Sequence, residues 1–201
     1  MKTITPAAEV RRHILETGQA IMSGKGFSAV GLTEILTAAG VPKGSFYYYF
    51  KSKDAFGEAL LEQYFADYMA EITVLLEKPG QSGAERLIAY WEKWLGTQAG
   101  CDHQGKCLAV KLGAEVADLS EAMRNALRIG TARIMQRLAK AIDEARADGS
   151  LVVEGDALFL AETLYQLWIG ASLLEKITRN GEPLKTAMVA TRRILNLSLP
   201  K

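Results

Sequence analysis

The stretch "LTEILTAAGVPKGSFYYYFKSKDAF", residues 32–56, contains two short helical patterns separated by a turn. Apolar residues recur at helical spacing over residues 32–39. Gly40-Val41-Pro42 then predicts a tight turn, because glycine accepts a positive φ and proline fixes its own. A second short helix is expected over about residues 43–50. Two short helices joined by a glycine-containing turn are typical of a helix-turn-helix.

The second predicted helix is aromatic, with three successive tyrosines between two phenylalanines. Phe46 and Phe50 are four residues apart, so both lie on one side of a helix and would anchor it inward. Three buried phenols would all need hydrogen-bond partners, which makes simple packing against a neighbour the weaker alternative. Residues 40–53 hold three lysines and no acid, so an outward-facing surface here favours a polyanion.

In a helix-turn-helix the second helix lies in the DNA major groove and its first residues meet the base edges. Lys43 and Ser45 would donate hydrogen bonds to bases or phosphates, and Gly44 would keep the backbone close to the DNA. The tyrosine hydroxyls suit phosphate oxygens. Lys53 begins the next helix, where free N–H groups and an ammonium favour a phosphate. The predicted DNA-binding set is Thr33, Lys43, Gly44, Ser45, Tyr47, Tyr48, Tyr49 and Lys53.

The rest of the chain also has helical periodicity, and no segment is typical of a strand. Ser52 is expected to cap a long helix that ends near residue 77. The predicted fold is therefore all-α, with an N-terminal three-helix helix-turn-helix domain over residues 1–52 and a C-terminal helical bundle over residues 53–201. Other helices are expected over about residues 7–23, 84–97, 107–117, 121–147, 156–179 and 183–197.

Composition places the chain among soluble globular proteins, with 201 residues, 49% hydrophobic residues and a net charge of +1. Two cysteines are too few for a disulfide framework, which favours a reducing compartment. The longest uncharged stretch, residues 163–174, is shorter than a membrane span of about 20 residues. We expect a cytoplasmic protein without a membrane segment.

Catalysis has no recognisable residues in this sequence. There is no nucleophile–base pair and no phosphate-binding glycine loop. Cys101, His103 and Cys107 lack the spacing of zinc ligands. Glu115 and Asp118 are interpreted as charges on a solvated helix face or near a helix end. We expect no catalytic residue, no metal and no cofactor, and a protein that is not an enzyme.

On residues 32–56 and their surroundings, about 14–61, the chain resembles the TetR family of one-component transcriptional repressors. The resemblance implies binding to double-stranded operator DNA. It also implies a C-terminal bundle that binds an inducer and forms a homodimer through the last two helices. One departure is Gly31, which stands where the family usually has a capping Ser or Thr. Thr33 lies just inside the helix and would have to supply the hydroxyl.

The last two predicted helices carry apolar stripes that permit such a dimer. Small residues over 170–172 would allow two helices to approach closely. For either helix, packing within its own subunit is an equal alternative. The stripes are Leu160, Leu164, Leu167, Trp168, Ala171 and Leu174 in the first helix, and Leu184, Ala187, Met188, Thr191, Ile194 and Leu195 in the second.

The segment "KCLAVKLGAEVADLSEAMR", residues 106–124, resembles the NemR-like subgroup of the family, whose members repress genes for electrophile-detoxifying reductases. The resemblance implies that Cys107 is a reactive sensor. At the start of a helix, beside Lys106, the helix dipole and the lysine charge would favour its thiolate. Lys176 is a more speculative partner for the modified thiol. The alternative for Cys107 is a buried small hydrophobic residue.

The sequence thus predicts a TetR-type repressor released from its operator by a small molecule, or by an electrophile or oxidant sensed through Cys107. A reversible, non-covalent apolar or aromatic inducer is the first alternative. The second is a helical interaction or enzyme domain that does not bind DNA and keeps the helix-turn-helix only as a scaffold.

Overall fold

The computed structural model describes residues 6–99 and 107–198. Within these ranges the chain forms nine helices and no strand, which confirms the predicted all-α class. The helices are α1 (Pro6–Lys25), α2 (Leu32–Ala39), α3 (Lys43–Tyr49), α4 (Lys53–Leu76), α5 (Gly83–Ala99), α6 (Leu108–Leu119), α7 (Glu121–Ala147), α8 (Ala157–Thr178) and α9 (Glu182–Ile194).

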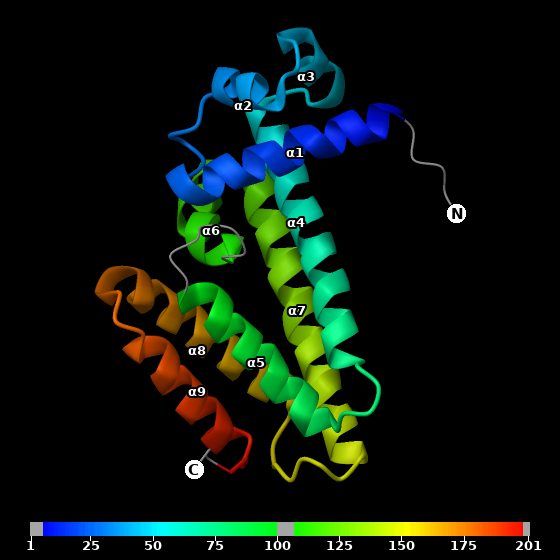
Figure 1. The fold of residues 1–201 in the computed structure, drawn as a ribbon, viewed down its shortest axis with the longest axis vertical. Helices are drawn as coiled ribbons and strands as arrows, with labels where there is room; N and C mark the ends of the chain where they lie inside the picture. Colours follow the sequence, from blue (N-terminus) through cyan, green and yellow to red (C-terminus); the bar gives the residue numbers. More distant parts are fainter. Residues whose placement is uncertain (1–5, 100–106, 199–201) are drawn as a thin grey trace. The chain divides into compact units, whose positions relative to one another are not determined.

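These helices form two compact units (Figure 1). The first contains the described residues up to Ala66 together with those from Cys107 to Gly130. It therefore combines α1, α2, α3 and α6 with the beginnings of α4 and α7. The second contains the remainder of α4 and α7 with α5, α8 and α9. The predicted functional division after residue 52 stays a prediction.

The core of the first unit is built around phenylalanines from α3 and α4. Phe46 lies 5.2 Å from Phe50 and 5.6 Å from Phe56 between ring centroids. Gly18 of α1 faces the same cluster, where a Cβ atom would come within 2.5 Å of the Phe56 ring. Glycine at this position therefore lets α1 cross closely over α4, and the aromatic cluster holds α3 in place.

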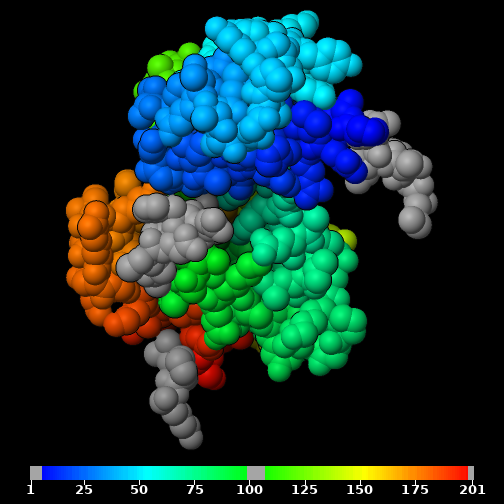
Figure 2. Space-filling view, turned by 45° about the horizontal axis from the view of Figure 1, so that its top comes forward, coloured from blue at the N-terminus to red at the C-terminus, as the bar shows by residue number. Residues whose placement is uncertain are grey.

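The turn between α2 and α3 forms as the sequence predicts. Gly40 adopts φ +65°, the left-handed conformation that favours glycine. The N–H groups of Gly40 and Val41 donate to the carbonyls of Thr37 and Leu36, which closes the end of α2. Pro42 then starts α3. Figure 2 shows α1, α2 and α3 as one continuous blue-to-cyan surface of the first unit.

Helix starts follow local capping residues. The Ser52 hydroxyl accepts from Ala55 N at 3.0 Å and caps α4, as predicted. At the start of α8, Asp156 accepts from Phe159 N at 2.8 Å. Helix ends agree less well: α9 was expected to reach residue 197 but ends at Ile194, because Asn196 takes a positive φ of 52°.

In the second unit α5, α8 and α9 lie side by side around three tryptophans (Figure 1). Trp91 stacks on Trp168 with ring centroids 5.2 Å apart and an interplanar angle of 15°. Two indole N–H groups donate to buried hydroxyls: that of Trp94 to Ser172 at 3.0 Å, and that of Trp168 to Thr191 at 2.8 Å. These two bonds satisfy the indole N–H groups of Trp94 and Trp168, whereas that of Trp91 has no acceptor among the described residues.

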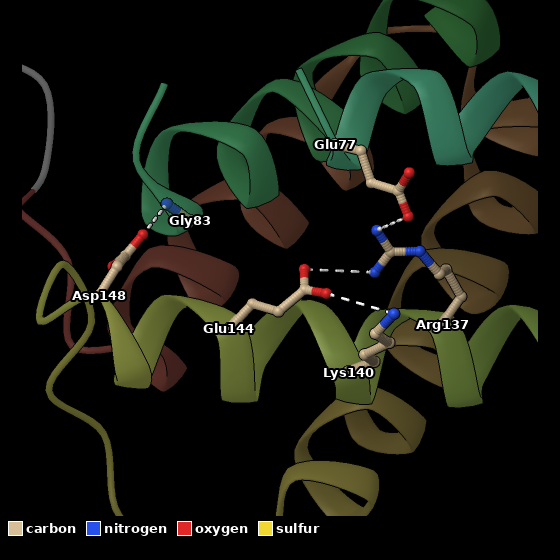
Figure 3. Close-up of polar contacts among 6 residues, drawn as sticks. All are labelled: Glu77, Gly83, Arg137, Lys140, Glu144 and Asp148. Atoms are coloured by element: carbon tan, nitrogen blue, oxygen red, sulfur yellow. Dashed lines mark hydrogen bonds and ion pairs between the residues drawn. The ribbon is translucent and has the colours of Figure 1, made fainter. Parts of the chain in front are cut away.

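A charged network joins the end of α4 to α7 (Figure 3). The nine-tenths buried Arg137 lies between Glu77, 3.4 Å away, and Glu144, 3.6 Å away. At the start of α5, Gly83 N donates to the Asp148 carboxylate at 2.7 Å. Hydrogen bonds from Ser150 and from Gly83 lower the pKa of Asp148. These contacts fix α5 against the end of α7.

By length and composition, α8 is the only helix in the described ranges that is long and apolar enough to cross a membrane. The expectation of no such segment counted only the uncharged residues 163–174, whereas the helix also qualifies when up to two charges are tolerated. Trp168 and neighbouring residues of α8 are buried in the second unit, and core helices of soluble proteins meet the same criterion.

Candidate nucleic-acid interface and thiol site

Helix α3 separates its aromatic residues onto two faces. Phe46 and Phe50 are buried, at 0% and 3% exposure, and attach the inner face of the helix to the core. Tyr47 and Tyr48 are exposed at 54% and 77%. Tyr49 is half-buried and meets the Tyr48 ring edge-on at 4.9 Å. The predicted inward phenylalanines are confirmed, and Tyr47 and Tyr48 lie on the outer surface.

The first turn of α3 is open to a partner. Lys43 and Gly44 are exposed, and Ser45 is half-buried, with its N–H bonded to Pro42 O at 2.9 Å. A Cβ atom on Gly44 would meet nothing within 4 Å, and its φ is not positive. Its own surroundings therefore do not require glycine at this position. A closely approaching outside partner would supply such a requirement.

As expected from the sequence, the start of α2 lacks a capping Ser or Thr. Gly31 is the N-cap, with φ −81° and ψ 151°, and no side chain caps the helix. Thr33 is exposed in the first turn. Next to it, Glu34 forms an ion pair with Lys25 at 2.5 Å. The first turn of α2 therefore has no side-chain cap, and Thr33 within it is open to a partner.

Lys53 is more engaged within the protein than the sequence suggested. Its Nζ donates to Phe27 O at 2.9 Å and lies 4.6 Å from the centre of the Phe27 ring. An ammonium has three donors, so a phosphate can share it. The exposed Lys51, which was not singled out, is the neighbouring lysine with a more open side chain.

Cys107 lies where the sequence placed it, at the N-cap of α6. It is 9% exposed, and its thiol makes no capping hydrogen bond to the helix. The following N–H, of Leu108, donates to the Tyr64 hydroxyl at 3.3 Å. Lys106, whose charge was predicted to favour the thiolate, lies outside the described residues. Lys176 is half-buried on α8 in the other unit, so its pairing with Cys107 stays a prediction.

Glu115 was expected on a solvated helix face, but its carboxylate is hydrogen-bonded to the backbone of the loop that follows α1. Its two carboxylate oxygens accept hydrogen bonds from Phe27 N at 3.0 Å and Ser28 N at 2.7 Å. Burial alone would raise the pKa of Glu115, but the hydrogen bonds from Ser28 and Phe27 and the Lys53 charge lower it overall. No local sequence signal indicates this contact, because donor and acceptor are 88 and 87 residues apart.

Family models match both parts of the chain. One described as "Bacterial regulatory proteins, tetR family" matches residues 14–60, which contain α2 and α3. Another, "Tetracyclin repressor-like, C-terminal domain", matches residues 83–191. This chain belongs to the TetR family. Its helix-turn-helix is thus the DNA-binding part of a TetR-type transcriptional regulator, as the resemblance implied.

Individual TetR-family relatives match over nearly the whole chain. The HTH-type transcriptional repressor NemR of Escherichia coli K12 is 41% identical over 93% of this chain and 94% of its own length. The repressor DhaR of a Mycobacterium species is 35% identical over 87% and 86%. The crystal structure of reduced E. coli NemR matches with a TM-score of 0.87, covering 96% of this chain and 98% of that one.

Proposed function

We propose that this TetR-family protein is a cytoplasmic repressor that binds operator DNA as a homodimer and leaves it when Cys107 is modified by an electrophile or oxidant. The DNA-binding part of this proposal rests on the two faces of α3. Phe46 and Phe50 are buried on its inner face, and Tyr47 and Tyr48 are exposed on its outer face. Lys43 and Gly44 at its open end would meet base edges, and the phenols would meet phosphates.

The exposed face of α8 supports the dimer. Phe159 and Ile177, separated by five helical turns, are exposed at 65% and 70%, and Leu173 is exposed beside Ile177. Gly170 lies between them on the same face, where a Cβ would meet nothing within 4 Å. Most of the predicted apolar stripe, including Trp168, instead packs within its own unit. A homodimer would place two recognition helices about 34–36 Å apart on successive major grooves.

Chemistry at Cys107 would supply the signal. Its thiolate would add to the β-carbon of an α,β-unsaturated carbonyl, forming a C–S bond while the C=C electrons move to the carbonyl oxygen. Water then protonates the α-carbon, and no group leaves. A peroxide would instead oxidise the thiolate to a sulfenic acid and be reduced to water. Cys107 is the N-cap of α6, where the helix dipole favours a thiolate.

A reversible ligand in the second unit is the second candidate. Trp91 is fully buried, and its indole N–H has no hydrogen-bond acceptor among the described residues. A ligand with a suitable acceptor, lying against the aromatic cluster, would satisfy this donor. Such an inducer would dialyse away and would act equally on a protein that lacks the Cys107 thiol.

The test measures affinity for a duplex that covers the DNA upstream of the protein's own gene, before and after treatment with N-ethylmaleimide. The wild type and Cys101→Ser are expected to lose affinity on alkylation, while Cys107→Ser keeps it. Release of Cys107→Ser to the same extent would refute the sensor assignment. Binding should weaken steeply with rising salt, and an affinity that ignores salt would contradict DNA binding itself.

A further inference from the structure

Helix α6 holds the end of α1 and the following loop through two oppositely charged side chains. Lys111 Nζ donates to Gly24 O at 2.9 Å. Glu115, one turn further along α6, accepts from the N–H groups of Phe27 and Ser28. Residues four apart lie on one face of a helix, so both side chains reach the same segment. We call this set of three hydrogen bonds the α6–loop contact.

Each charge in the α6–loop contact meets backbone groups of opposite polarity. Gly24 O belongs to the last turn of α1, where carbonyls lack intrahelical partners and a cation is favoured. The carboxylate of Glu115 pairs with two successive N–H groups of the loop. Gly26 completes the fit, because it adopts φ +95° and a Cβ there would come within 3.0 Å of Glu115 Oε2. The loop conformation and the carboxylate are therefore matched.

The same loop also contacts the beginning of α4. Phe27 donates its N–H to Glu115 and accepts at its carbonyl from Lys53, the first residue of α4. A Cβ on Gly57 would collide with the Phe27 ring, so α4 and this ring are in close contact as well. Lys53 follows α3 by a short connection. Phe27 therefore connects α6 with α4, the helix that follows α3 in the chain.

Cys107 lies one helical turn before Lys111, the first residue of this contact. Its carbonyl accepts from Lys111 N at 3.1 Å, which fixes the lysine one turn from the thiol. Cys107 is only 9% exposed, so a group added to its thiol needs space among packed neighbours, and a shift of α6, which begins beside it, would provide that space.

We propose that the α6–loop contact transmits modification of Cys107 to the DNA-binding helices, with Glu115 as the positioning residue. The inference rests on the proposed function, since it takes Cys107 as the sensor. A shift of α6 would move the backbone of Phe27 and Ser28 through the carboxylate. The loop leads directly into α2, so the spacing of α2 and α3 in the dimer would change with it.

The test compares wild type, Glu115→Gln and Glu115→Ala by the ratio of operator Kd after and before alkylation with N-ethylmaleimide. Mass spectrometry confirms that Cys107 is fully alkylated in each, and thermal melting confirms folding. Asp118→Asn, an exposed carboxylate on the same helix, is the matched control. Lys111→Met alone and combined with Glu115→Gln gives a double-mutant cycle, which isolates the coupling between the two side chains.

We expect a ratio of about 5- to 150-fold for wild type and Asp118→Asn, the usual range of coupling between sites. The ratio should fall for Glu115→Gln and approach one for Glu115→Ala. A carboxylate that only stabilises the fold would weaken both operator constants equally and leave the ratio unchanged, which would overturn the inference. If fully alkylated wild type keeps its affinity for the operator, Cys107 is not the sensor. The proposed transmission through the α6–loop contact then fails as well.

Discussion

Gly44 shows how a single residue separates the demands of folding from those of binding. Within the protein, a methyl group at this position has free space and a permitted backbone. Alanine is also the better helix former, by up to about 1 kcal/mol. The only expected obstacle to a side chain here is DNA against the first turn of α3.

We therefore predict that Gly44→Ala keeps or slightly raises the melting temperature but weakens operator binding about tenfold or more, equivalent to about 1.4 kcal/mol. Melting followed by circular dichroism and binding followed by fluorescence anisotropy check the two parts. Gly96→Ala, on the exposed side of α5 with similar free space, is the control and should leave binding unchanged. Unaltered binding by the Gly44 variant would mean that this turn does not approach the DNA.

Residues whose role depends on near neighbours in sequence were predictable. Phe46 and Phe50 share a face by spacing alone, and Ser52 caps α4 through an N–H three residues away. Glu115 and Lys53 were not, because their partners, Phe27 and Ser28, lie on distant segments that only the fold brings close. Local chemistry therefore indicated the elements, while the polar contacts between elements required the structure.

At the scale of elements, the attachment of α6 to the α1–α2 loop depends on the charge of Glu115. The folded protein lowers the pKa of this carboxyl below its ordinary value of 4.5. The unfolded chain therefore binds the proton more readily than the folded protein does. The contribution of Glu115 to stability is present above that ordinary value and is lost as the pH falls through the lower pKa of the folded state.

We predict that Glu115→Gln is less stable than wild type at neutral pH, and that this difference shrinks as the pH falls below 4.5. Urea unfolding followed by circular dichroism over this pH range measures it. The same comparison with Asp118→Asn should show a smaller difference at neutral pH. If the difference in stability between wild type and Glu115→Gln stays constant down to acid pH, the charge of the carboxylate is not what holds the loop.

At the scale of the whole molecule, the exposed apolar residues of α8 have no partner within the described part of their own subunit that would explain them. Isolated surface apolar residues are ordinary, but Phe159, Leu173, Leu174 and Ile177 gather on one helix. The sequence predicted an apolar stripe on this helix as a dimer surface, but most residues of that stripe face inward. Periodicity indicates that a helix has an apolar face but not which of two faces meets the subunit core.

We predict that Ile177→Asp shifts the protein from dimer to monomer and lowers operator affinity, because one recognition helix alone covers half of the site. Sedimentation analysis gives the mass and anisotropy gives the affinity. Val74→Asp, an equally exposed apolar residue on α4, should remain dimeric. A dimeric Ile177→Asp would move the interface away from this face.

The stacked pair of Trp91 and Trp168 has a practical consequence. All three tryptophans of the chain lie in the second unit, whereas the first has only tyrosines and phenylalanines as aromatic residues. Indole emission therefore reports on one half of the molecule alone, without any attached dye. Followed beside circular dichroism, which averages over both halves, this natural optical probe reveals whether the DNA-binding half and its companion melt together or one after the other.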